Sequence, residues 1–376
     1  MSHPGPGGEA ANSDGEHSGS TSETPDPSVE PESVLSAMGW REVVQALVGL
    51  GAAGALVFYG LPFVADTTWP QIGEQLALVG LAPALAMAGL LVAGLYCYTF
   101  TMIGSLPGLN HLRALTVNTA GSMVANILPG GGAIGVAVTY LMFRSWGFAR
   151  AAIGTSLIVT TIWNMLARLT LPILGGLAVL LGPVDAPRSV VVAALVATAM
   201  GLLFLGFFGG VVFSDTAARE VGSAVATLTS PVARRFPRVG NLNGVMADQR
   251  VRIEGVVRRS SVMMSLGLVG MFGCFFVLYV VSARTVGVEL ALIPLFAAYA
   301  FRQFLTVVAI TPGGLGITEV GTAGILVAFG GDPASAAAAA LLYAVFTHLL
   351  EVPLGAFATL GWWLTRNRSA SNRPRG

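Results

Sequence analysis

The chain has 376 residues, of which 54% are hydrophobic and only 10% are charged, and its mean hydropathy is +0.74. Soluble domains carry about 25% charged residues, so this composition excludes a water-soluble globular protein. It predicts an all-α protein that crosses a membrane several times. The formal net charge is +1, and no nucleic-acid partner is expected.

The chain begins with a polar segment and continues with apolar ones. Residues 1–38 hold seven acidic residues and no arginine, which predicts a disordered acidic cytoplasmic tail. A helical span needs about 20 apolar residues, and six are expected, at 41–64, 76–100, 150–182, 188–213, 259–282 and 334–363. The predicted divisions are a first membrane repeat at 39–213, an Arg-rich cytoplasmic loop at 214–258, a second membrane repeat at 259–365 and a basic tail at 366–376.

Two further apolar segments, 113–144 and 288–330, are each interrupted by a Pro-Gly turn. The turns are Leu128-Pro-Gly-Gly-Gly132 and Thr311-Pro-Gly-Gly-Leu-Gly316. Both limbs of the first segment are too short to cross a hydrocarbon core about 30 Å thick. The first segment therefore predicts a re-entrant helical hairpin. The second is also expected to be a hairpin, although its first limb is long enough to span.

The arginines give the expected orientation, because cytoplasmic loops of membrane proteins are enriched in basic residues. With the N-terminus and the loop 214–258 in the cytoplasm, sixteen arginines lie on the cytoplasmic side and two, Arg188 and Arg284, lie outside. The remaining two fall within the membrane. Both termini are thus predicted to be cytoplasmic, in a multi-pass protein of the plasma membrane.

The two halves of the chain align without a gap at an offset of 183 residues. Pro129 aligns with Pro312, Gly130 and Gly131 align with Gly313 and Gly314, and the span 76–98 aligns with 259–281. The first hairpin opens toward the cytoplasm and the second toward the outside, which predicts an inverted repeat. Transporters commonly use such repeats, with the binding site near the midplane.

Two motifs give a resemblance to a known family. Ala309-Ile-Thr-Pro-Gly-Gly-Leu-Gly-Ile-Thr-Glu-Val320 resembles a signature of the lysylphosphatidylglycerol synthase transmembrane-region family, whose members are flippase-like membrane proteins. Asn126-Ile-Leu-Pro-Gly-Gly-Gly-Ala-Ile-Gly135, followed by Arg144-Ser-Trp-Gly147, resembles the first hairpin of that family. The resemblance covers most of residues 41–365. It implies a role in moving a polar lipid, or in holding one for processing.

The chain also departs from the family pattern. Many members carry an acid and an arginine just after the first Pro-Gly turn, whereas Gly132, Ala133, Gly135 and Val136 are uncharged here. No soluble aminoacyl-transferase domain is expected. The resemblance therefore implies the membrane part of the family's function and not lipid synthesis.

The glycines of both turns are the first candidates for a lipid or anion site. A helix start has unpaired N–H groups and a partial positive charge, which suits a lipid phosphate. The alternative is that these glycines only permit close helix crossing. The candidates are Gly130, Gly131, Gly132, Gly313, Gly314 and Gly316.

Ionisable side chains within the membrane are the second group of candidates, because such groups normally face a cavity or a partner. Arg302 is expected either to pair with Glu319 or to bind a phosphate, and Glu319 is either a helix-start acid or a ligand. Arg168 and Glu351 occupy equivalent positions at the offset of 183. They are expected to form a structural ion pair or, with His348, a gate.

No nucleophile, metal-ligand spacing or cofactor motif is present, so neither an enzyme nor a metal or cofactor site is expected. The predicted function is translocation of an anionic or phosphate-bearing membrane lipid. One alternative is a proton-coupled transporter of a small solute. The other is a non-transporting subunit that supports a lipid-modifying or glycosyl-transfer enzyme, with the partner enzyme bound at 214–258. The oligomeric state is left open.

Overall fold

Regular structure in this protein is helical wherever the chain is described. The computed structural model describes residues 40–128, 131–183, 187–213, 242–308 and 311–371, and these residues form no β-strand. Six helical segments are long and apolar enough to cross a membrane: Leu47–Ala65, Leu81–Ser105, Arg150–Leu181, Val190–Phe207, Arg252–Thr285 and Pro333–Thr365. They confirm the all-α, six-span prediction, and each overlaps the span predicted for it.

The first part of the described chain runs from Trp40 to Phe213. Its elements are α2 (Trp40–Ala55), the π-helix η1 (Leu56–Gly60), α3 (Leu61–Ala65), α4 (Trp69–Leu76), α5 (Leu81–Ser105), α6 (His111–Ile127), α7 (Gly131–Ser145), α8 (Arg150–Leu181) and α9 (Arg188–Phe213). The short helix α4 was not predicted. A capping box at its start, in which the Gln71 side chain accepts a hydrogen bond from the Thr68 amide, stabilises it.

The second part runs from Leu242 to Ser371. Its elements are α11 (Leu242–Thr285), α12 (Leu292–Val308), the 3₁₀ turn η3 (Pro312–Gly314), α13 (Ile317–Ala328), α14 (Pro333–Ala344), the π-helix η4 (Val345–Leu349) and α15 (Glu351–Ser371). The side chain of Asp332 caps α14 by accepting a hydrogen bond from the Ser335 amide at 2.9 Å. One predicted span, 334–363, is therefore made of α14 and α15 with a π-helical segment between them.

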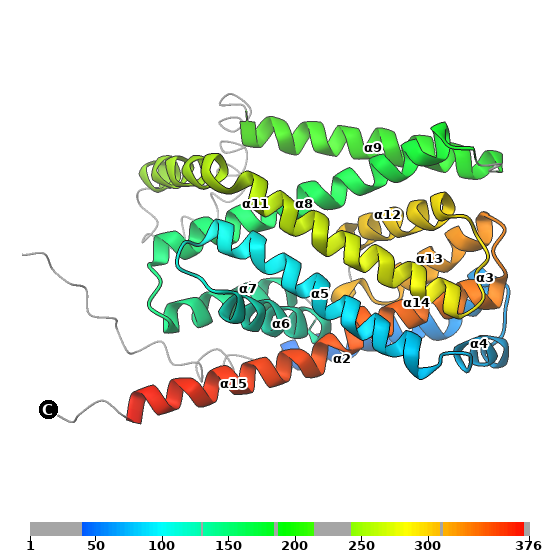
Figure 1. Cartoon of the computed structure of the whole chain (residues 1–376), viewed down its shortest axis with the longest axis horizontal. Helices are drawn as coiled ribbons and strands as arrows, with labels where there is room; N and C mark the ends of the chain where they lie inside the picture. The colour runs from blue at the N-terminus through cyan, green and yellow to red at the C-terminus, as the bar shows by residue number, and fades with distance from the viewer. Residues whose placement is uncertain (1–39, 129–130, 184–186, 214–241, 309–310, 372–376) are drawn as a thin grey trace, which may run out of the picture. The chain divides into compact units, whose positions relative to one another are not determined.

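Helix packing brings distant parts of the sequence together. Helix α5 packs along α11, α8 packs against both α9 and α12, and α15 packs along α6 (Figure 1). Small residues permit the close α5–α11 contact: a Cβ at Gly267 would lie 2.6 Å from Thr101 Oγ1. Figure 1 also shows the α6–α7 pair and the α12–α13 pair in opposite halves of the bundle.

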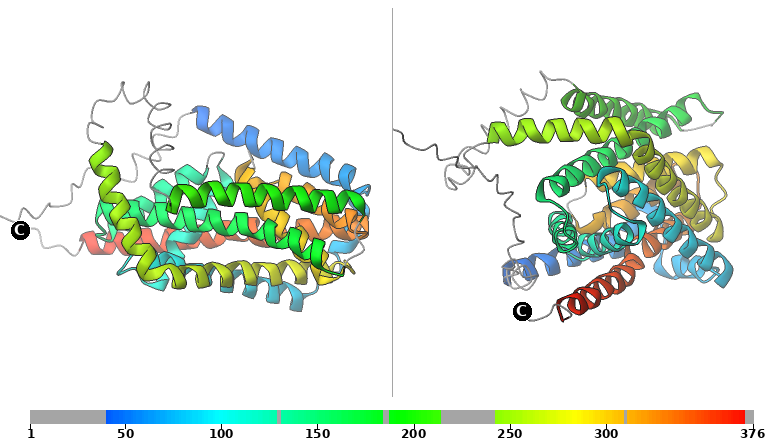
Figure 2. Two further views of the ribbon diagram at one scale, coloured as in Figure 1. Left: turned by 90° about the horizontal axis from the view of Figure 1, so that it is seen from above. Right: turned by 60° about the vertical axis from the view of Figure 1, so that its left-hand side comes forward.

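Two predicted segment boundaries differ from the structure. Helix α11 begins at Leu242, so the second part of the expected loop 214–258 is helical, and α15 continues to Ser371 inside the expected tail 366–376. Residues 242–258 contain no proline, and lengthening an existing helix needs no new nucleus. Figure 2 shows that α11 bends, so that its first turns run in a different direction from its apolar part. Residues 1–38 and 214–241 lie outside the described part.

Candidate functional site

Three glycines shape the turn between α12 and α13. Gly313, Gly314 and Gly316 have φ values of 59°, 77° and 88°, a left-handed conformation that strongly favours glycine. The Thr311 hydroxyl closes the turn by donating a hydrogen bond to the Leu315 carbonyl at 2.8 Å. The run Pro-Gly-Gly-Leu-Gly is thus required by the backbone path itself.

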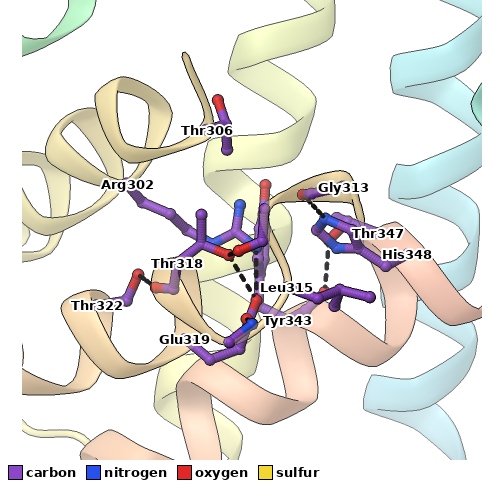
Figure 3. Close-up of polar contacts among 12 residues, drawn as sticks. Arg302, Thr306, Gly313, Leu315, Thr318, Glu319, Thr322, Tyr343, Thr347 and His348 are labelled. Atoms are coloured by element: carbon purple, nitrogen blue, oxygen red, sulfur yellow. Dashed lines mark hydrogen bonds and ion pairs between the residues drawn. The ribbon is translucent and has the colours of Figure 1, made fainter. Parts of the chain in front are cut away.

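A buried ion pair joins the two helices that flank this turn. Arg302 of α12 lies 3.2 Å from Glu319 of α13, and the two side chains are only 3% and 1% exposed (Figure 3). Thr318 donates a hydrogen bond to the same Glu319 oxygen at 2.8 Å, and the other oxygen accepts from the Gly316 amide. The guanidinium also lies over the Tyr343 ring at 4.6 Å. Of the two roles expected for Arg302, the structure shows pairing with Glu319.

Glu319 is accordingly held as a helix-start acid. Its side chain accepts a hydrogen bond from the Gly316 amide at the start of α13, where a negative charge is favourable. Both of its oxygens are occupied by protein donors. The pair therefore stabilises the α12–α13 turn and leaves no Glu319 oxygen for a ligand, while Arg302 Nε is buried without a hydrogen-bond partner.

Close packing explains several of the candidate glycines. A Cβ at Gly131 would lie 2.5 Å from the Val124 carbonyl oxygen, and one at Gly316 would lie 3.0 Å from the Ala53 carbonyl oxygen. Gly132 differs, because a Cβ there would meet nothing within 4 Å. Gly130 lies outside the described residues. Gly131, Gly313 and Gly316 thus serve backbone geometry or packing, whereas Gly132 faces open space.

The turn between α12 and α13 contacts the end of α6. A Cβ at Gly313 would lie 2.8 Å from Asn126 Oδ1 and 3.0 Å from the His348 ring. His348 Nε2 makes a 3.0 Å hydrogen bond with the Gly313 carbonyl, and its Nδ1 lies 3.1 Å from the Thr347 hydroxyl (Figure 3). The two interrupted segments therefore meet, with His348 of the π-helix η4 between them.

Glu351 contacts the other segment. It begins α15, is 7% exposed, and accepts a hydrogen bond from the Asn126 amide of α6 at 3.4 Å. His348 and Glu351 thus bind different interrupted segments, although they are only three residues apart. We call Asn126, Gly313, His348 and Glu351 the tip junction.

Arg168 does not pair with Glu351, contrary to one of the expected arrangements. Its Nε donates to Asn164 Oδ1 at 2.8 Å, and its Nη1 donates to Gln303 Oε1 at 3.1 Å and to the Thr306 hydroxyl. All three acceptors are neutral. The reason is packing: α8 lies against α12, which presents Gln303 and Thr306, whereas α15 lies against α6. The symmetry of the sequence did not reveal this difference between the two helices.

Sequence reasoning also missed the aromatic surroundings of the ion pair. Tyr279, Tyr299 and Tyr343 are fully buried and contact one another, with ring centroids 5.5 to 6.4 Å apart. Tyr299 precedes Arg302 by one helical turn, which is the one local signal that links these residues. In the described part of the chain, no group of three or more His, Cys, Asp or Glu side chains is placed to hold a metal ion.

Comparison with known proteins identifies a family. A family model described as the lysylphosphatidylglycerol synthase TM region matches residues 47–355. The match covers both interrupted segments, the tip junction and Arg168. No curated protein matches the chain.

Proposed function

Since this chain belongs to the lysylphosphatidylglycerol synthase transmembrane-region family, we propose that it translocates a polar, anionic or phosphate-bearing lipid across the cell membrane. The head group passes the tip junction while the acyl chains stay in the bilayer. In this proposal the protein is a flippase-like transporter and not an enzyme.

The observation that carries the proposal is the contact between the two interrupted segments. Helices α6, α7, α12 and α13 have 17, 15, 17 and 12 residues. At 1.5 Å per residue these helices are about 18 to 26 Å long, which is shorter than a hydrocarbon core of about 30 Å. We therefore regard both pairs as re-entrant hairpins that open to opposite sides. Their contact would place the polar groups of the tip junction near the midplane, where transporters bind cargo.

Helix boundaries support the repeat of 183 residues on which the proposed inverted arrangement depends. Helix α8 begins at Arg150 and α14 begins at Pro333, which correspond at the offset of 183. Gly147 and Gly330, which also correspond, have φ values of 87° and 90°. Both repeats therefore end their second hairpin limb with the same left-handed turn before the long helix begins.

The π-helix η4 supplies a place where the two hairpins could move relative to each other. Helix α14, before η4, packs against α13 of the second hairpin, and α15, after η4, packs along α6 of the first. π-Helical turns are rare and occur often at functional sites. Rocking about η4 would separate Gly313 from Asn126 and expose the tip junction to each side in turn. His348, in the last turn of η4, and Glu351, the first residue of α15, act as the gate.

We infer the orientation from the arginines, sixteen of which fall on one side and two on the other. Both termini are then cytoplasmic, and we propose that the membrane is the plasma membrane. Glu254 on α11 and Glu289 before α12 are both exposed and test this. In a chain without native cysteines, an impermeant maleimide added to intact cells should label the Glu289→Cys variant and leave the Glu254→Cys variant unlabelled. The reverse pattern would invert the assignment.

A lipid-movement assay tests the function. The purified chain is reconstituted into vesicles that contain phosphatidylglycerol with a fluorophore on one acyl chain, and dithionite is added to quench the outer leaflet. We expect quenching to continue beyond the outer-leaflet share, because lipid from the inner leaflet reaches the outside. Quenching equal to that of protein-free vesicles would contradict translocation. If an enzyme then co-purified with the chain, the non-transporting alternative would be favoured.

A further inference from the structure

The two arginines within the membrane-spanning region differ in burial and in charge partners. Arg302 is 3% exposed and is neutralised by Glu319. Arg168 is partly exposed, and in the described part of the chain no carboxylate lies within ion-pair distance of it. Because an unpaired charge inside a bilayer is unfavourable, a protein normally retains one only where it faces a cavity or a ligand.

The hydrogen bonds of Arg168 orient its guanidinium without neutralising it. Asn164 on α8 accepts from Nε, and Gln303 and Thr306 on α12 accept from Nη1. The guanidinium also lies 5.7 Å from the Phe272 ring centroid. No hydrogen bond within the described residues involves Nη2. The protein therefore holds Nε and Nη1 of this cation in place, and Nη2, with its two N–H groups, has no hydrogen-bond partner among the described residues.

A phosphate oxyanion is the chemistry that fits such a pair of donors. The two N–H groups of Nη2 lie in the guanidinium plane, and each can donate a charge-assisted hydrogen bond to an oxygen of a phosphate monoester or diester. The Arg168 guanidinium cannot bind a metal ion, because a permanently protonated guanidinium has no lone pair to donate. The uncompensated positive charge selects against cationic groups.

We propose that Arg168 is the anchor for the phosphate of the transported head group, with Asn164, Gln303 and Thr306 as positioning residues. The inference rests on the proposed function and adds to it the residue that selects the cargo. Since two of the positioning residues belong to α12, the anchor also connects α8 to the second hairpin. Cargo bound there would contact both elements at once.

Lipid binding to the full-length chain in detergent, measured by native mass spectrometry, tests the anchor. The probes are phosphatidylglycerol, a galactosyl diacylglycerol without phosphate, and inorganic phosphate. The variants are Arg168→Gln and Arg168→Lys. The control is Arg113→Gln, which also removes one positive charge but at an exposed position beside Trp146. Thermal unfolding of each variant shows whether it is folded.

We expect the parent and the Arg113→Gln variant to bind phosphatidylglycerol well above the galactolipid. Arg168→Gln should weaken phosphatidylglycerol binding roughly tenfold or more, since a hydrogen bond to a charged group is lost. Arg168→Lys should bind at an intermediate level, because an ammonium keeps the charge but lacks the planar group that Asn164, Gln303 and Thr306 hold in place. It also provides the comparison if Arg168→Gln does not fold. Equal binding by the parent and both Arg168 variants would overturn the anchor.

Inorganic phosphate, the third probe, distinguishes a site for a lipid phosphate from a site for free phosphate. Weak binding of inorganic phosphate beside strong binding of phosphatidylglycerol supports a lipid head group. Binding of inorganic phosphate as tight as that of the lipid would overturn the lipid assignment.

Different results would contradict the phosphate anchor at Arg168 and the proposed lipid translocation. Arg168-dependent binding in a chain that moves no lipid between leaflets would contradict translocation and leave the anchor standing. Lipid movement at the same rate in the parent and in Arg168→Gln would contradict the anchor and leave translocation standing.

Discussion

At the scale of single residues, the decisive contrast is between a paired and an unpaired arginine. Arg302 and Glu319 form a buried pair, with both carboxylate oxygens occupied. Removing one partner of such a pair leaves an uncompensated buried charge, whereas replacing both with apolar residues is often tolerated. Arg168 has hydrogen bonds to three neutral side chains and no such dependence on a countercharge.

This contrast predicts how the two partners of the pair respond to substitution. Glu319→Ala alone should lower the free energy of unfolding by roughly 3–5 kcal/mol, seen as a lower thermal unfolding midpoint in detergent. The double variant Arg302→Met/Glu319→Leu should recover much of that loss. If Glu319→Ala were as stable as the parent and lost only lipid movement, the carboxylate would be a ligand and not a structural partner.

The sequence singled out these ionisable residues but did not determine which of them pair. Pairing of Arg302 with Glu319 was one of two expectations, because the distance between their side chains depends on how α12 and α13 pack. Arg168 and Glu351 correspond under the repeat, yet their helices pack against different neighbours. An alignment of the halves compares sequence positions, and it contains no information on which face of each helix is covered.

At the scale of elements, glycine spacing controls how closely the limbs of the first hairpin approach. A Cβ at Gly135 of α7 would lie 2.8 Å from the Gly121 carbonyl oxygen of α6, which is backbone and has little room to move. Gly132, one turn earlier on α7, has nothing within 4 Å of that position. The two glycines therefore form a matched pair within one helix.

Alanine substitution should separate their roles. Gly135→Ala should force α6 and α7 apart and lower the free energy of unfolding by about 1–3 kcal/mol. Gly132→Ala should be neutral or stabilising by up to about 1 kcal/mol, because alanine favours the helix. Thermal unfolding of both variants in the same detergent checks this. Equal shifts for the two would mean that the limbs are not closely packed.

The interrupted helices themselves were predicted from the sequence because Pro-Gly-Gly turns are strong local signals. The bounds of α7 and α13 follow directly from those turns. The π-helices η1 and η4 were not predicted, since nothing in the composition of Leu56–Gly60 or Val345–Leu349 distinguishes these segments from α-helix. Their geometry arises from packing against neighbouring helices, which only the folded structure contains.

At the scale of the whole molecule, apolar runs were sufficient to predict the six membrane spans, since each needs about 20 residues and the runs are long. The contact between the interrupted segments could not be predicted from the sequence, because it joins Asn126 to residues more than 180 positions away. The tip junction is nevertheless the centre of the proposed mechanism. If the two hairpins separate during each transport cycle, fixing them together should stop lipid movement.

The most direct test therefore locks the tip junction. An Asn126→Cys/Gly313→Cys chain, with Cys97 and Cys274 replaced by alanine, is reconstituted with fluorescent phosphatidylglycerol and assayed before and after oxidation, and again after reduction. A cysteine at the left-handed position 313 costs about 1–2 kcal/mol, and Asn126→Cys removes the nearest atom that its Cβ would meet. The strain is present in the reduced and the oxidised chain alike, so the reduced chain is the reference. We expect lipid movement when the cysteines are reduced, movement no faster than in protein-free vesicles when they are cross-linked, and recovery on reduction. Unchanged lipid movement in the fully cross-linked protein would contradict the account.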